Sequence, residues 1–290
     1  MPRPLDLPIV DHHCHLSLHG EGVRAARRFA AAGGTHLFLA TQNYSTGDPP
    51  TRVDDYAKQF ETTEALARRV TDATGVVVYL VVAPYPIDLL STASRLGLAA
   101  AVEVQMGALE LAGRWVDEQR AVALGEVGRP HFPVSGELGE AAETVFRHAL
   151  EVARDVGCPA VVHCDDLDAD GYRDLASFAA KSAFPLGKLV KHYARVVRPP
   201  VELGGIVPSY VARRDTVRDA LPQPGPWFLE TDFLDDPRRP GAVLDLATVP
   251  RRASAIAEGS ADARDRLSVP FVESIRSVYG FAPTLAGAAP

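Results

Sequence analysis

Short apolar runs alternate with longer amphipathic stretches along almost the whole chain. The runs are rich in valine, leucine and alanine, and their length and spacing are typical of buried β-strands. We expect strands at residues 9–16, 35–41, 76–82, 121–126, 159–163, 186–192, 203–207 and 227–232. Helical spacing of apolar positions predicts helices at residues 22–32, 52–74, 87–96, 107–118, 138–156, 171–182, 215–221, 249–258 and 269–279.

The alternation of strands and helices predicts a parallel sheet with helical crossovers. Eight strands of this kind favour a single (β/α)8 TIM barrel over residues 1–290, with extra helices at the C-terminal end. One connection, Arg198-Pro199-Pro200, is too short to hold a full crossover helix. The alternative is an open doubly wound sheet, which usually carries a glycine-rich phosphate loop after its first strand. We find no such loop here.

Composition narrows the possible partners and the compartment. Hydrophobic residues make up 47% of the chain, which is enough for a large core, and the formal net charge is −7. This charge gives no basic field for extended duplex nucleic acid. Three cysteines do not make a disulfide framework, and residues 1–10 lack a signal-peptide pattern, so we expect a cytoplasmic protein. No apolar stretch is long enough to span a membrane.

The first predicted strand ends in two histidines that suit a metal site. His13 and His15 are two residues apart, so in a strand they point to the same side while Cys14 points to the other. Imidazole binds borderline divalent cations well. A run of histidines can also be a solvated turn, but here an apolar strand leads directly into it.

Other metal-capable residues end later strands. Glu126 ends the fourth, His163 the fifth, His192 the sixth and Asp232 the eighth. Each of them alone has an ordinary structural explanation. In a barrel, however, the carboxyl ends of all strands share the rim where such enzymes place their chemistry. A binuclear centre needs a bridging carboxylate, for which Glu126 is suitable, and a terminal carboxylate near the reactive water, for which Asp232 is suitable.

The ordered motifs resemble those of the TatD-type metal-dependent hydrolases of the amidohydrolase superfamily. The similar blocks are Asp11-His12-His13-Cys14-His15-Leu16, Leu124-Gly125-Glu126-Val127-Gly128, Val162-His163-Cys164, Val190-Lys191-His192 and Leu229-Glu230-Thr231-Asp232. The sequence Asp235-Asp236-Pro237-Arg238-Arg239-Pro240-Gly241 is similar to a divergent, mainly archaeal branch. The resemblance implies that His13, His15, Glu126 and Asp232 hold one ion. It implies that Glu126, His163 and His192 hold a second.

The chain departs from TatD deoxyribonucleases around the substrate. These enzymes usually carry an arginine soon after the strand-five histidine, where this chain has Cys164-Asp165-Asp166. They tend to have Gly-Leu-Asp after the strand-four glutamate, where this chain has Gly128-Arg129-Pro130-His131. We expect substrate contacts from Arg129, His131 and Arg238, although loop packing or solvation explains each arginine equally well.

The predicted activity is two-metal hydrolysis, with Asp232 as general base and Glu126 as the shared ligand. Mixed imidazole and carboxylate ligands suit two divalent ions, with zinc first and manganese, magnesium, iron or cobalt also compatible. We expect a small-molecule or short nucleic-acid substrate, with phosphodiester hydrolysis ranked above that of a small amide, lactone or cyclic compound. A catalytically idle, metal-binding barrel is the remaining alternative.

Overall fold

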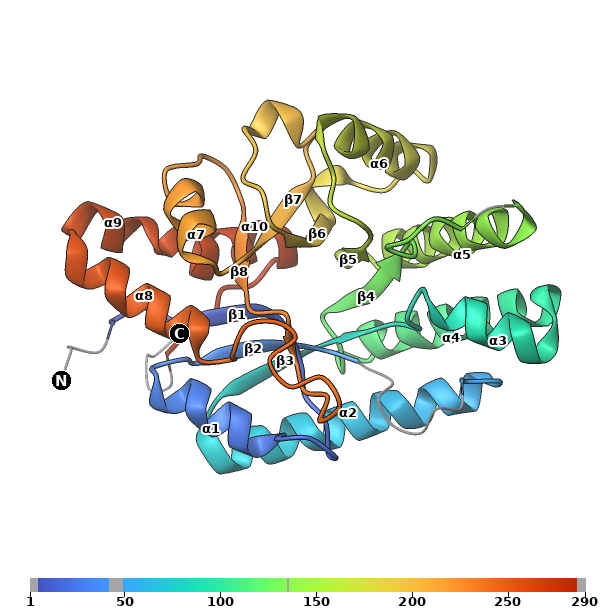
Figure 1. Cartoon of the computed structure of the whole chain (residues 1–290), viewed down its shortest axis with the longest axis horizontal. Coiled ribbons are helices and arrows are strands. Elements are labelled where there is room, and N and C mark those ends of the chain that lie inside the picture. The colour runs from blue at the N-terminus through green and yellow to red at the C-terminus, as the bar shows by residue number, and fades with distance from the viewer. Residues whose placement is uncertain (1–4, 42–48, 135, 286–290) are drawn as a thin grey trace.

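The computed structural model describes residues 5–41, 49–134 and 136–285, and it contains one sheet of parallel strands (Figure 1). The nine strands follow the order β8-β7-β6-β5-β4-β3-β2-β1-β9. Their bounds are β1 Val10–His15, β2 His36–Ala40, β3 Val77–Val82, β4 Ala123–Gly128, β5 Ala160–His163, β6 Leu189–Ala194, β7 Val207–Val211, β8 Phe228–Glu230 and β9 Phe233–Leu234. The sheet therefore runs through the chain in sequence order, as a (β/α)8 barrel requires.

The sheet closes because its last two strands are one interrupted strand. Only Thr231 and Asp232 separate β8 from β9, and Asp232 has a positive φ of 49°. Residues of β8 pair with β7, whereas Phe233 and Leu234 of β9 pair with β1. The eighth strand thus joins the seventh to the first. The predicted TIM-barrel fold is confirmed.

Helices surround the sheet on its outer side (Figure 1). They are α1 Val23–Ala31, α2 Val53–Thr74, α3 Asp88–Leu96, α4 Leu98–Asp117, α5 Gly136–Asp155, α6 Ala169–Lys181, α7 Arg214–Ala220, α8 Thr248–Gly259, α9 Ala261–Arg266 and α10 Ser274–Tyr279. Shorter turns are η1 Leu186–Lys188, η2 Pro200–Glu202 and the π-turn η3 Val269–Glu273. No helix in the described ranges is both long and apolar enough to cross a membrane.

Two buried clusters follow from the alternation of side chains along the strands. One lies between the strands and the surrounding helices and includes Cys14, whose thiol donates to the Phe38 carbonyl 3.6 Å away. The other fills the barrel, packs against α8 and α10, and includes Val10 and Phe228. Inside it, His12 stacks on Phe228 at 3.8 Å between ring centroids. The barrel interior is therefore a packed core.

The sixth and seventh strands differ from the sequence prediction. The sixth was expected at residues 186–192, but residues 186–188 form η1 and the strand begins at Leu189. The seventh was expected at residues 203–207 and lies at Val207–Val211. Gly204 and Gly205 both have positive φ values, 59° and 86°, so this apolar stretch turns before the strand can start. In addition, α4 begins nine residues before the predicted residue 107, and α9 was not predicted.

Candidate metal centre

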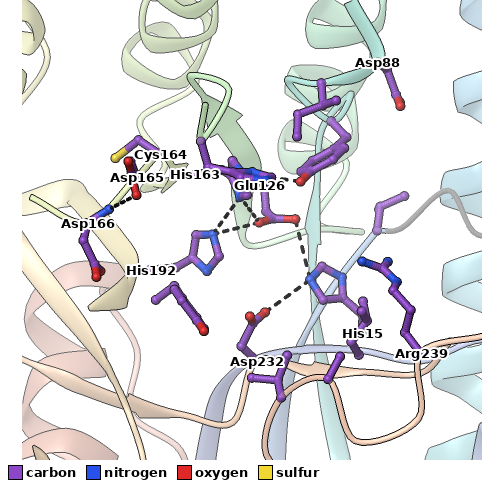
Figure 2. Close-up of a pocket in the computed structure, with 18 of the residues that line it drawn as sticks. His15, Asp88, Glu126, His163, Cys164, Asp165, Asp166, His192, Asp232 and Arg239 are labelled. Carbon is purple, nitrogen blue, oxygen red and sulfur yellow. Dashed lines mark hydrogen bonds and ion pairs between the residues drawn. The ribbon is translucent and has the colours of Figure 1, made fainter. Parts of the chain in front are cut away.

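All six predicted ligands come from one end of the barrel. His13 and His15 lie on β1, Glu126 on β4, His163 and His192 on β5 and β6, and Asp232 between β8 and β9. Figure 2 shows five of them converging at the floor of a cavity of about 610 Å³. The sixth, His13, is fully buried beside them. Their proximity follows from strand order, because the carboxyl ends of parallel strands meet at one rim.

The first group of ligand atoms lies around the end of β1. The Nε2 atoms of His13 and His15 are 3.1 Å apart. Asp232 Oδ1 is 3.8 Å from His13 Nε2 and 3.7 Å from His15 Nε2. The backbone N–H of Asp232 donates to the His13 carbonyl at 3.0 Å, so the break in the eighth strand holds this carboxylate over the two imidazoles.

The second group lies across the barrel and shares Glu126 with the first. Glu126 Oε1 is 2.9 Å from His163 Nδ1 and 2.8 Å from His192 Nε2. Glu126 also faces the first group, with Oε1 3.8 Å from His13 Nε2 and Oε2 3.6 Å from His15 Nε2. A carboxylate between two sets of imidazoles has the position of a bridging ligand.

The charges around these residues fit divalent cations. Three carboxyl groups lie here: Glu126 and Glu230 are buried, and the side chain of Asp232 is 17% exposed. No arginine or lysine in the described part of the chain forms an ion pair with any of them, and the basic groups that contact them are imidazoles. Buried carboxylates need compensating charge. The donor set of imidazoles and carboxylates is the one that borderline divalent ions accept.

The pKa values of the predicted ligands are shifted by burial and by the charges of their neighbours. Burial lowers the pKa of His15 to about 4 and that of His13 well below its usual range, so both rings are in the neutral form that binds metal. Burial opposes ionisation of Glu126, but His192 and His163 hold its pKa well below the usual range. Burial also opposes protonation of His192, yet the carboxylates of Glu126 and Glu230 raise its pKa to about 10. Because Glu126 is ionised and raises the pKa of its neighbour His192, a positive charge is favoured next to the Glu126 carboxylate.

Two residues next to the ligands were missed by the sequence prediction. Glu230 is fully buried, accepts the backbone N–H of Tyr193 at 2.6 Å and lies 3.6 Å from Nδ1 of His192. Tyr85 follows β3 and places its hydroxyl 3.3 Å from Nε2 of His163. The signal for Glu230 was its place two residues before Asp232 in the eighth strand. Tyr85 follows the third strand between two prolines, at the same rim.

The structure brings only one of the three predicted substrate contacts into the cavity. His131 lines it, with Nδ1 2.9 Å from His163 Nε2. Arg129 does not line it, because its guanidinium is held by Glu143 at 2.6 Å and Asp174 at 2.7 Å. Arg238 does not line it either; its side chain is 71% exposed and pairs with Asp236.

Two other arginines line the cavity in their place. Arg195 follows β6 and donates its Nε–H to Asp166 at 2.6 Å. Arg239 follows β9 and donates its Nε–H to Asp236 at 3.1 Å. Of the adjacent Arg238 and Arg239 it is therefore Arg239 that lines the cavity, and sequence spacing does not say which of two adjacent side chains turns inward.

Comparisons with known proteins agree with this fold. An uncharacterised protein of Methanocaldococcus jannaschii is 30% identical over 251 residues, which are 84% of this chain and 86% of that protein. The crystal structure of a TatD homologue from Escherichia coli K12 has a TM-score of 0.61 at 16% identity, covering 94% of this chain and 98% of that one. A mutant of a PTE-like lactonase from Deinococcus radiodurans has a TM-score of 0.59 at 13% identity, covering 95% and 96%.

The two structural matches are too distant in sequence to show more than the fold. The sequence profile of a family described as TatD related DNase is more specific, because it matches residues 10–280 and so includes every predicted ligand. On that match, this chain belongs to the TatD related DNase family.

Proposed function

We propose that the protein hydrolyses phosphodiester bonds with a binuclear centre held by His13, His15, Glu126, His163, His192 and Asp232. Family membership and the amidohydrolase-like structural neighbours support the coarser part of the proposal, a metal-dependent hydrolase. The observation that carries the binuclear part is the shared position of Glu126, whose carboxylate faces imidazoles of both groups at 2.8 to 3.8 Å.

In the proposed mechanism the metal ions would activate the water, and side chains of the protein would transfer its proton. Two divalent ions, when bound, would lower the pKa of a water molecule and polarise the bond that is attacked. Asp232 lines the cavity with Oδ1 3.8 and 3.7 Å from the two β1 imidazoles, whereas Glu126 is also engaged by His163 and His192, so Asp232 is placed to accept the water proton. From there it can return the proton to the leaving oxygen. His131 lines the same cavity and is the second candidate for this transfer.

Two cationic side chains favour an anionic substrate. Arg195 and Arg239 line the cavity from the loops after β6 and β9. Each gives part of its guanidinium to a carboxylate, Asp166 or Asp236, which holds the side chain in place. Because the chain carries a net charge of −7, we propose a short or terminal nucleic-acid segment rather than an extended duplex.

A second candidate function is hydrolysis of a small lactone, amide or cyclic compound. Apolar side chains of Ile87, Leu90 and Leu234 line part of the cavity and suit an uncharged ring. The same fold occurs in the lactonase structure described above. The phosphodiester proposal ranks first because the two cavity arginines have no function with an uncharged substrate.

Turnover of bis(p-nitrophenyl) phosphate, measured beside a lactone and amide panel on metal-replete protein, separates these candidates. We expect diester hydrolysis to be the faster reaction. Asp232→Asn keeps an oxygen ligand but removes the basicity, so kcat should fall by roughly 100-fold or more while the metal content stays near two ions per chain. Normal kcat in this variant would move the base to another residue, with His131 tested next. No turnover on any substrate would favour the idle, metal-binding barrel.

A further inference from the structure

The cavity has a buried floor and an exposed rim, and one arginine at the rim has donors to spare. The ligands Glu126 and His192 at the floor are 6% and 3% exposed, whereas the side chain of Arg239 is 60% exposed. A substrate that reaches the ligands therefore leaves its neighbouring groups at the rim. In the view of Figure 2, Arg239 is drawn on the same side of the cavity as His15, and Asp165 and Asp166 are on the opposite side.

Arg239 is held in place by two hydrogen bonds to Asp236. Its Nε–H donates to Asp236 Oδ2 at 3.1 Å, and its backbone N–H donates to the Asp236 carbonyl at 2.9 Å. The Asp236 side chain is itself 2% exposed. A guanidinium has five N–H donors, and no hydrogen bond within the described chain uses the four on the terminal nitrogens of Arg239. One N–H from each terminal nitrogen forms the planar edge that binds a phosphate at two points.

The other cavity arginine is more fully committed. Arg195 uses both Nε and a terminal nitrogen on Asp166, so its charge is matched by a carboxylate at the same rim. Arg239 also acts electrostatically on the hydroxyl of Tyr85, which contacts the ligand His163. Arg239 is thus the cavity cation that combines free donors with a position close to the ligand group.

We propose that Arg239 selects substrates that carry a second anionic group next to the scissile phosphodiester, such as a nucleotide bearing a further phosphate. This inference rests on the proposed phosphodiesterase function and adds its substrate class. The scissile group lies at the floor among the metal ligands, and the second phosphate lies at the rim against the terminal nitrogens of Arg239. A strand end with a terminal phosphate meets this requirement in a cavity that admits only a short segment.

The neighbouring Arg238 provides a matched control. It follows the same strand and pairs with the same Asp236, but it does not line the cavity. The variants Arg239→Gln and Arg238→Gln remove the same charge from adjacent positions. A general effect of net charge on an anionic substrate would appear in both variants. An effect of a rim contact would appear in Arg239→Gln alone.

The first arm of the test is kinetic. Thymidine 5′-(p-nitrophenyl phosphate) is compared with the same ester bearing a 3′-phosphate. A second pair consists of thymidine 3′-(p-nitrophenyl phosphate) and the same ester bearing a 5′-phosphate. We expect wild type and Arg238→Gln to prefer the phosphorylated ester of at least one pair by about tenfold in kcat/KM, the scale of one charge-assisted contact. Arg239→Gln should lose this preference, mainly through KM.

The second arm does not depend on catalysis. Calorimetric binding of thymidine 3′,5′-bisphosphate and of the two thymidine monophosphates is measured for the same three proteins. Tighter binding of the bisphosphate that disappears only in Arg239→Gln supports the inference, even if no ester is hydrolysed and the phosphodiesterase proposal fails. Hydrolysis of both esters at equal rates, or equal losses in the two variants, would overturn the role of Arg239 and leave the proposed function standing.

Discussion

Asp235, just after β9, binds the segment that follows β1 and so connects the last strand to the first. Its substitution should destabilise the protein measurably. The carboxylate is 3% exposed and accepts three backbone N–H groups from the segment after β1. Oδ2 accepts from Ser17 at 2.9 Å and from Gly22 at 2.8 Å, and Oδ1 accepts from Glu21 at 2.7 Å. In Asp235→Asn one oxygen becomes an amide nitrogen, so at least one of these donors loses its acceptor.

The size of the effect follows from these contacts. An orphaned buried donor costs about 1 to 3 kcal/mol, and the remaining bonds weaken when the acceptor loses its charge. We expect a loss of about 2 to 5 kcal/mol in the free energy of unfolding. The entropy of unfolding is about 2.1 cal/mol/K per residue, or about 0.6 kcal/mol/K for 290 residues. The melting temperature should therefore fall by about 3 to 8 °C.

Asp236→Asn is the control, measured in parallel by circular dichroism or calorimetry. Asp236 pairs with arginines that are 71% and 60% exposed, and asparagine can still accept the Arg238 backbone N–H. Its effect should be smaller, about 1 kcal/mol, because no backbone donor loses its acceptor and the partner guanidinium groups lie largely in solvent. If Asp235→Asn melts within 1 °C of Asp236→Asn, the three bonds do not contribute as argued.

Three further predictions concern metal, pH and nucleic acid. The double substitution His13→Ala and His15→Ala should reduce bound metal from near two ions towards one per chain by elemental analysis; retention of both contradicts the ligand assignment. Burial raises the pKa of Asp88 to about 7, so the folded state binds the extra proton and stability should fall as pH rises from about 4 to 7. In Asp88→Asn this pH-dependent loss should disappear. The effect of the substitution on the free energy of unfolding, measured in urea melts, should therefore be about 1 to 2 kcal/mol more favourable at pH 8 than at pH 5. Equal effects at both pH values would refute the argument. Cleavage of DNA should favour ends and short single strands with a shallow salt dependence, and tight sequence-specific duplex binding would contradict this.

The sequence was sufficient to place the six predicted ligands at one rim because strand ends and barrel geometry together determine their positions. An apolar run that stops at a histidine or a carboxylate marks the carboxyl end of a strand, and a barrel gathers all such ends on one rim. The prediction tolerates errors of a few residues in the strands themselves. The sixth strand begins three residues later than expected, yet His192 remains on it.

The substrate side of the cavity was predicted less well, because loops determine it. Arg129 meets Glu143 on α5 and Asp174 on α6, and nothing in the local sequence shows that those helices bring two carboxylates to it. Arg238 and Arg239 are adjacent, and the choice between them depends on the turn after β9. Side-chain direction in a turn has no fixed period, unlike that in a strand or a helix.

The interruption of the eighth strand links the closure of the barrel to the placement of His13, His15 and Asp232. Asp11 is fully buried, and its carboxylate accepts the Thr231 backbone N–H at 3.0 Å, the Thr231 hydroxyl at 2.6 Å and the His13 backbone N–H at 3.2 Å. It therefore ties the last strand to the first at the residues next to Asp232 and His13. The break at positive φ lets residues on one side pair with β7 and those on the other with β1, while Asp232 between them faces the histidines. The first group of predicted ligands is thus assembled only when the barrel closes, since His13 and His15 come from the first strand and Asp232 from the break in the last.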